Sequence, residues 1–76
     1  MKIAGTLHYN AGEDRIGITD RTGHWIFSGF HCGQMMEINI GLGWIADRIE
    51  YGCNWYLTAS RLTGSQLEGL KVRITA

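Results

Sequence analysis

Alternation of apolar and polar residues is the main pattern in this chain, and it predicts short β-strands. Residues 3–10 are the clearest case, with Ile3, Gly5, Leu7 and Tyr9 on one face and polar or small residues between them. A period of two is typical of a strand that buries one face. Further strands are expected at 15–19, with Ile16 and Ile18 inward, and at 24–28, 36–40 and 70–74.

Turn-forming residues separate these stretches. Asn10-Ala11-Gly12 reverses the chain, and the Asp20–Gly23 segment fits a type I turn because Asp is first and Gly is fourth. Residues 28–33 lack periodicity and predict a structured loop anchored by Phe30. Residues 65–68 are long enough for one helical turn only.

Residues 43–57 predict a β-hairpin, and its two faces decide the register. Only a three-residue loop, Gly52 to Asn54, places apolar residues opposite one another. That loop calls for a positive φ at its last residue, which Asn54 tolerates. The resulting cross-strand pairs are Tyr51 with Trp55 and Ile49 with Leu57.

This register gives the hairpin one face for the core and one for solvent. The core face carries Ile45, Ile49, Tyr51, Trp55 and Leu57. Asp47 lies on the same face but is charged, so it does not fit this pattern. Aromatic rings beside an arginine are typical of binding hot spots. We therefore expect binding residues on the solvent face, at Trp44, Arg48, Glu50 and Tyr56. The alternative is that Trp44 covers the open end of the barrel with Arg48 packed on its ring.

Six or seven short strands without a long helix predict an all-β protein. The expected fold is a small antiparallel SH3-like barrel formed by residues 1–76 as a single domain, with an OB-like barrel as the alternative. Barrel closure would protect the edges of so small a sheet. With 76 residues and 45% hydrophobic content, the chain can form a core of its own.

Charge and cysteine content narrow the function classes. The net charge is zero and the basic residues are scattered, which argues against a dedicated nucleic-acid binder. No apolar run is long enough for a signal peptide or a membrane span, so we expect a cytoplasmic protein that does not bind a membrane. In that compartment Cys32 and Cys53 are expected as free thiols, Cys53 at an exposed turn.

The spacing of the histidines and cysteines does not favour a metal site or a catalytic site. The candidate zinc ligands do not form the close pairs that zinc sites use, and we interpret them as a buried thiol and loop histidines. A Cys–His nucleophile lacks a helix N-terminus that would activate the thiol. We expect no enzyme activity, no metal and no cofactor. The ligand candidates considered are His8, His24, His31, Cys32 and Cys53.

A series of short motifs lies along nearly the whole chain. The motifs are Gly5-Thr6-Leu7-His8-Tyr9-Asn10, His31-Cys32-Gly33, Gly43-Trp44-Ile45, Arg48-Ile49-Glu50, Trp55-Tyr56-Leu57 and 67–74. In this order and spacing they resemble a family of small domains of unknown function from Firmicutes, especially clostridia. The resemblance implies a bacterial cytoplasmic domain with an SH3-like barrel and brings no known catalytic or binding residues. The family usually has Pro-Thr before Arg-Ile-Glu, where this chain has Ala46-Asp47.

Three functions remain open at this point. The first is a non-catalytic module that binds a protein or peptide through the solvent face of the hairpin. The second is a nucleic-acid-binding accessory domain that uses Arg48, Tyr56, Lys71 and Arg73, for which affinity would fall steeply with salt. The third is a structural subunit that forms a weak homodimer through a strand edge.

Overall fold

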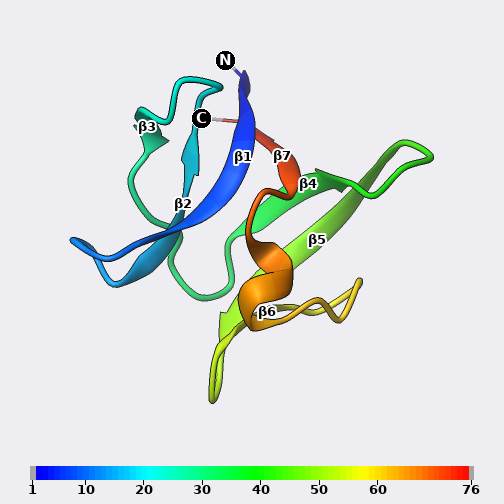
Figure 1. Ribbon diagram of the computed structural model, residues 1–76. Coiled ribbons are helices and arrows are strands. Elements are labelled where there is room, and N and C mark those ends of the chain that lie inside the picture. Colours follow the sequence, from blue (N-terminus) through cyan, green and yellow to red (C-terminus); the bar gives the residue numbers. More distant parts are fainter. Residues whose placement is uncertain (1, 76) are drawn as a thin grey trace.

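The computed structural model describes residues 2–75 and is an all-β structure with one 3-10 turn (Figure 1). This confirms the predicted antiparallel all-β class. Strand β3 is shorter than the sequence predicted. The strands are β1 (Lys2–Asn10), β2 (Arg15–Thr19), β3 (Trp25–Phe27), β4 (Met35–Asn39), β5 (Trp44–Tyr51), β6 (Trp55–Leu57) and β7 (Lys71–Thr75), and the 3-10 turn is η1 (Gly64–Leu67).

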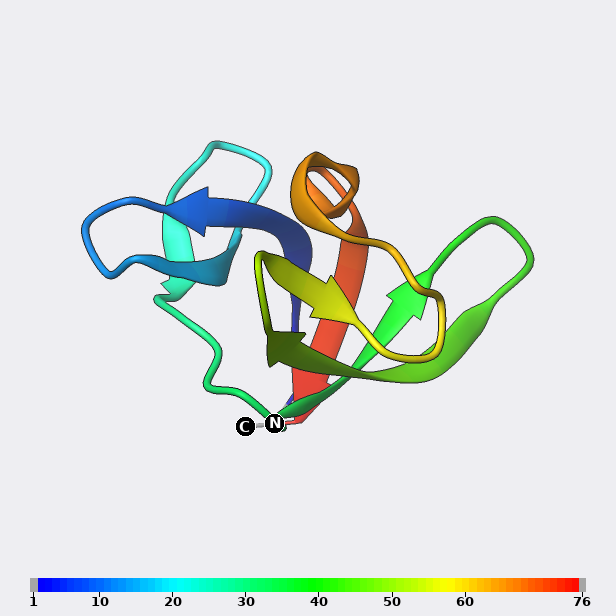
Figure 2. The same cartoon turned by 90° about the horizontal axis from the view of Figure 1, so that it is seen from below.

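The seven strands form one antiparallel sheet in the order β3-β2-β1-β7-β4-β5-β6. It curls into a half-barrel, seen from below in Figure 2, that is consistent with a small SH3-like barrel. The curl arises because two long strands change partner along their length. Strand β1 pairs with β7 up to Thr6 and with β2 from Thr6 onward. Strand β5 pairs with β4 up to Arg48 and with β6 from Ile49 onward.

Gly5 lies at the bend of β1, where two strands come very close. A Cβ atom at this position would lie 2.2 Å from the backbone oxygen of Thr19. The absence of a side chain therefore allows β1 to curve from one partner strand to the other.

The core lies inside the curl and contains the inward residues of nearly every strand. Phe30 is fully buried and its ring lies 4.7 Å from that of Phe27, which confirms it as the anchor of the loop after β3. Leu67 of η1 is also fully buried, so the 3-10 turn covers the side of the core that the sheet leaves open. Completely buried strand residues include Leu7, Ile18, Ile38, Ile49, Leu57 and Val72.

The hairpin of β5 and β6 has the predicted register, with Ile49 opposite Leu57 and Tyr51 opposite Trp55. The predicted positive φ at Asn54 is wrong. The loop closes through a hydrogen bond from the Gly52 N–H to the Asn54 carbonyl, 3.0 Å long.

The predicted core faces are only partly buried. Tyr9, Ile45 and Tyr51 are exposed by 47%, 38% and 56%, because each lies near a strand end that extends beyond the core. Met35 is likewise exposed and Met36 is buried.

Asp47 does point inward, and its environment explains how the core accepts it. The side chain is 2% exposed and its carboxylate accepts backbone hydrogen bonds from Arg48, Ala59 and Ser60 at 2.8, 2.7 and 3.0 Å. Burial raises the pKa of Asp47, but these N–H donors lower it by more, so the pKa lies below its usual value. The carboxylate fastens the segment after β6 to the bend of β5.

Candidate functional site

The aromatic hollow is a depression of about 420 Å³ between β1, the β5–β6 hairpin and η1. We define it by three aromatic residues, Tyr9, Tyr51 and Trp55, and two carboxylates, Asp14 and Glu68. Clustered aromatic rings with a few polar groups are typical of ligand sites. Its position follows from the fold, because all three rings lie near strand ends that reach past the core.

The hairpin register sets the two rings of the hairpin against each other. Tyr51 and Trp55 are cross-strand partners, and their ring centroids are 4.9 Å apart in an edge-to-face arrangement. Trp55 also packs against the core, so it holds its neighbour in place. Tyr51 keeps 56% of its surface exposed, which leaves an aromatic face available for contact.

Both carboxylates of the hollow are held by Tyr9. The Tyr9 hydroxyl donates a hydrogen bond to Asp14, and the Tyr9 backbone N–H donates to Glu68 Oε2 at 2.6 Å. Glu68 Oε1 also lies 3.2 Å from His8 Nδ1. The hydrogen bond to Asp14, with a smaller effect of burial and of the nearby negative charge, raises the pKa of Tyr9, so its phenol remains a neutral donor.

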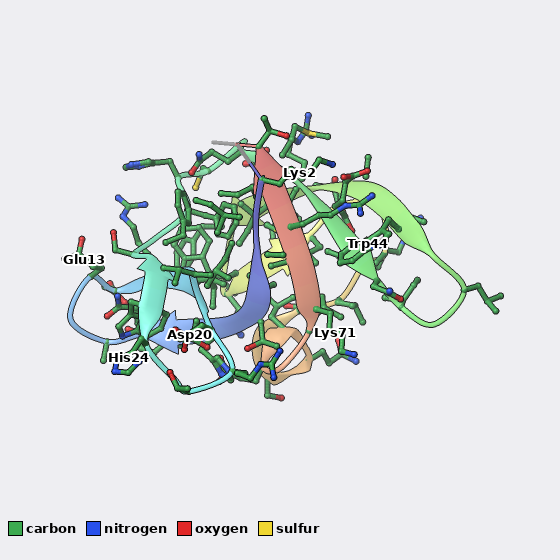
Figure 3. All side chains as sticks on the ribbon, turned by 90° about the horizontal axis from the view of Figure 1, so that it is seen from above. Lys2, Glu13, Asp20, His24, Trp44 and Lys71 are labelled. Atoms are coloured by element: carbon green, nitrogen blue, oxygen red, sulfur yellow. The ribbon has the colours of Figure 1, made fainter. Side chains whose placement is uncertain are left out.

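The four residues predicted to bind do share the solvent face of the hairpin strands, but they form two groups. Arg48 Nε lies 3.0 Å from Glu50 Oε2, so the two form a surface ion pair, and Glu50 is the cross-strand partner of Tyr56. Trp44 lies at the start of β5, opposite Asn39 of β4 and to one side of β7 (Figure 3). Their binding role stays a prediction.

The ring of Trp44 contacts a different arginine from the one predicted. The guanidinium of Arg73, on β7, lies 4.2 Å from the ring centroid. The strand order explains this contact, because β4 lies between β5 and β7 in the sheet. Trp44 of β5 reaches across β4 to Arg73 of β7. Glu37 of β4 holds Arg73 there through a hydrogen bond of 2.8 Å. The alternative in which Arg48 packs on the Trp44 ring is therefore wrong.

The surface proposed for nucleic acid is also divided. Lys71 borders a second depression of about 410 Å³ beside Trp44, with Arg21 on its rim. Arg48 and Tyr56 belong to the other end of the hairpin, where neither borders that depression. The basic residues chosen from the sequence thus do not share one groove.

The candidate metal ligands and thiols remain apart in the described residues, 2–75. No three His, Cys, Asp or Glu side chains come together there in a way that could hold a metal ion. Cys32 and Cys53 are both free and exposed, so the interpretation of Cys32 as a buried thiol is wrong. Within the same residues, none of the helical structure is long and apolar enough to span a membrane.

Sequence reasoning missed the aromatic hollow although it identified the pairs that build it. The register already placed Tyr51 beside Trp55, but alternation assigned both to the core. The available signal was their position next to the Gly52–Asn54 loop, since residues at a hairpin end have few neighbours to bury them. The approach of Tyr9 and η1 to this hairpin depends on tertiary structure alone.

Comparison with known proteins agrees with the fold and the sequence motifs. The model of the family described as Domain of unknown function (DUF5348) matches residues 5–74. The chain belongs to this family. A crystal structure of a Ruminococcus gnavus protein is similar to it, with 35% sequence identity, a TM-score of 0.76, and coverage of 95% of this chain and 100% of that chain. No curated protein matches this member of the family.

Proposed function

We propose that this domain is a non-catalytic module that binds an extended peptide segment of another protein in the aromatic hollow. The observation that carries the proposal is the convergence of Tyr9, Tyr51 and Trp55 on one depression, with Tyr51 largely exposed. Exposed aromatic residues gathered in one place mark interaction sites, since Tyr and Trp combine large apolar area with low loss of side-chain entropy.

The dimensions of the hollow favour a short segment over a folded partner. A volume of about 420 Å³ holds a few side chains, and it is open on one side. The polar groups around the rings, including Asn54 and Ser65, supply hydrogen-bonding partners for a peptide backbone. We therefore expect modest affinity, with Kd in the range of about 1 to 100 μM.

The test begins by selecting peptides from a display library of random dodecapeptides on the immobilised full chain. Selected peptides are then measured by fluorescence anisotropy against Tyr51→Ala and Tyr56→Ala, two variants of the same residue type on opposite faces of one hairpin. Thermal unfolding checks that both variants are folded. We expect Tyr51→Ala to weaken binding by about tenfold or more and Tyr56→Ala to change it by less than about twofold.

The opposite ranking would reject the hollow and support the solvent face predicted from the sequence. If no peptide is enriched, the peptide-binding function itself is wrong. Salt-dependent binding of a single-stranded oligonucleotide that is lost in Lys71→Glu would favour the nucleic-acid alternative instead.

A further inference from the structure

We propose that the aromatic hollow selects a segment with one positively charged side chain, arginine or lysine, which lies between Asp14 and Glu68. This inference rests on the peptide-binding function proposed above and names the chemistry that the peptide must carry.

The first observation is the negative charge of the hollow, where Glu68 lies 3.2 Å from the imidazole of His8 and Asp14 accepts a hydrogen bond from the Tyr9 hydroxyl. Asp14 and Glu68 are the charged residues among those that line it, and both are acidic. Two carboxylates elsewhere on the sheet do have basic partners. Glu37 lies within 3.4 Å of Lys2 and 2.8 Å of Arg73, and Glu50 pairs with an arginine. Within residues 2–75, no Lys or Arg forms an ion pair with either carboxylate of the hollow.

The second observation is that these two carboxylates are fixed in position. Both accept hydrogen bonds from Tyr9, one from its hydroxyl and one from its backbone N–H. Asp14 also has a φ of 53°, an uncommon backbone conformation that Asp tolerates better than most residues. A cation that enters the hollow therefore meets negative charge that is already oriented, which lowers the entropy lost on binding.

The third observation is the aromatic wall beside these charges. The edge-to-face pair of Tyr51 and Trp55 presents ring surface to the same depression. The negative face of an aromatic ring attracts ammonium and guanidinium groups, and a nearby carboxylate strengthens the preference. Neutral side chains gain only the apolar contact, and acidic ones are repelled. A basic side chain is the group that complements both the rings and the carboxylates.

Methylguanidinium tests the charge preference without a peptide. It is titrated into the isotopically labelled full chain at constant ionic strength, in parallel with methylurea, its neutral counterpart of similar shape. We expect a saturable shift of the Trp55 indole N–H and the Tyr51 amide with methylguanidinium, and an apparent affinity at least about threefold weaker for methylurea. Equal responses to the two compounds overturn the inference.

Charge-removing variants locate the effect. Asp14→Asn keeps a residue that tolerates positive φ, and Glu68→Gln keeps the acceptor oxygen for the Tyr9 N–H. Each is expected to weaken methylguanidinium binding by about threefold or more. Glu13→Gln removes the same charge from the neighbouring residue outside the hollow and should change it by less than about 1.5-fold. An equal loss in all three variants means a diffuse field effect and overturns the inference.

Selected peptides supply the final test. With arginine as the basic residue of the peptide, its replacement by citrulline, which is neutral and nearly the same size, should weaken binding to the unmodified chain by about tenfold but to Asp14→Asn by less than about threefold. Interchange of lysine and arginine should preserve binding within about threefold. Peptides that tolerate citrulline yet lose affinity for Tyr51→Ala overturn the charge preference while supporting the peptide function. Failure to select any peptide overturns both.

Discussion

Replacement of Asp47 tests how a core built mainly of apolar residues contains a buried carboxylate. Asp47→Ala removes the acceptor for three backbone N–H groups, those of Arg48, Ala59 and Ser60. Each hydrogen bond to a charged group contributes about 1.5 to 3 kcal/mol, and water can partly replace the carboxylate at the exposed Arg48 and Ala59. We expect the free energy of unfolding to fall by about 3 kcal/mol. A chain of this length has only about 4 to 11 kcal/mol in total.

Two further variants grade this effect. Asp47→Asn keeps one acceptor oxygen and should cost about 1 to 2 kcal/mol, because its amide NH₂ faces the N–H donors. Asp47→Thr offers one hydroxyl acceptor and should fall between Asn and Ala. Urea unfolding at pH 7, followed by tryptophan fluorescence, measures all three against the unmodified chain.

The pH dependence identifies the charge as the cause. The folded state lowers the pKa of Asp47 below its unfolded value of about 4. Its contribution is therefore fully present above about pH 4 and is lost as pH falls through the lower pKa of the folded state. The stability difference between the unmodified chain and Asp47→Asn should shrink at acid pH. A difference that stays constant down to about pH 2, or a loss below about 0.5 kcal/mol in Asp47→Ala at pH 7, would refute this reasoning.

Two more predictions concern the curl of the sheet and the tip of the β4–β5 hairpin. Gly5→Ala should lose about 2 kcal/mol or more, because its Cβ would lie 2.2 Å from the Thr19 oxygen, whereas Gly12→Ala, with its nearest atom at 3.4 Å, should lose less than about 1 kcal/mol in the same urea assay. Leu42→Ser should leave the melting temperature nearly unchanged, because Leu42 is fully exposed, whereas Ile38→Ala, four positions away and fully buried, should cost about 2 to 5 kcal/mol. Equal losses within either pair would contradict the packing described above.

Local patterns were sufficient for the strands and for the hairpin register. Alternation fixed the faces of β2 and β4, because a shift of one residue would expose Ile16 or Ile38. The glycines and Asp20 marked turns by their own backbone preferences, and the isolated aromatic between Gly29 and Gly33 marked the loop that Phe30 anchors. Each of these features depends on residues that are close together in the sequence, so the sequence predicts them without knowledge of the fold.

Tertiary structure decided which side chains lie next to one another at the surface. Whether Tyr51 is buried depends on how far β5 extends past the core, and whether Trp44 meets Arg48 or Arg73 depends on which strand lies beside β4. The same holds for Asp47, whose acceptors are satisfied by N–H groups twelve and thirteen residues away. A period of two tells which side of a strand a residue takes, but only the packing of distant segments determines what it meets there.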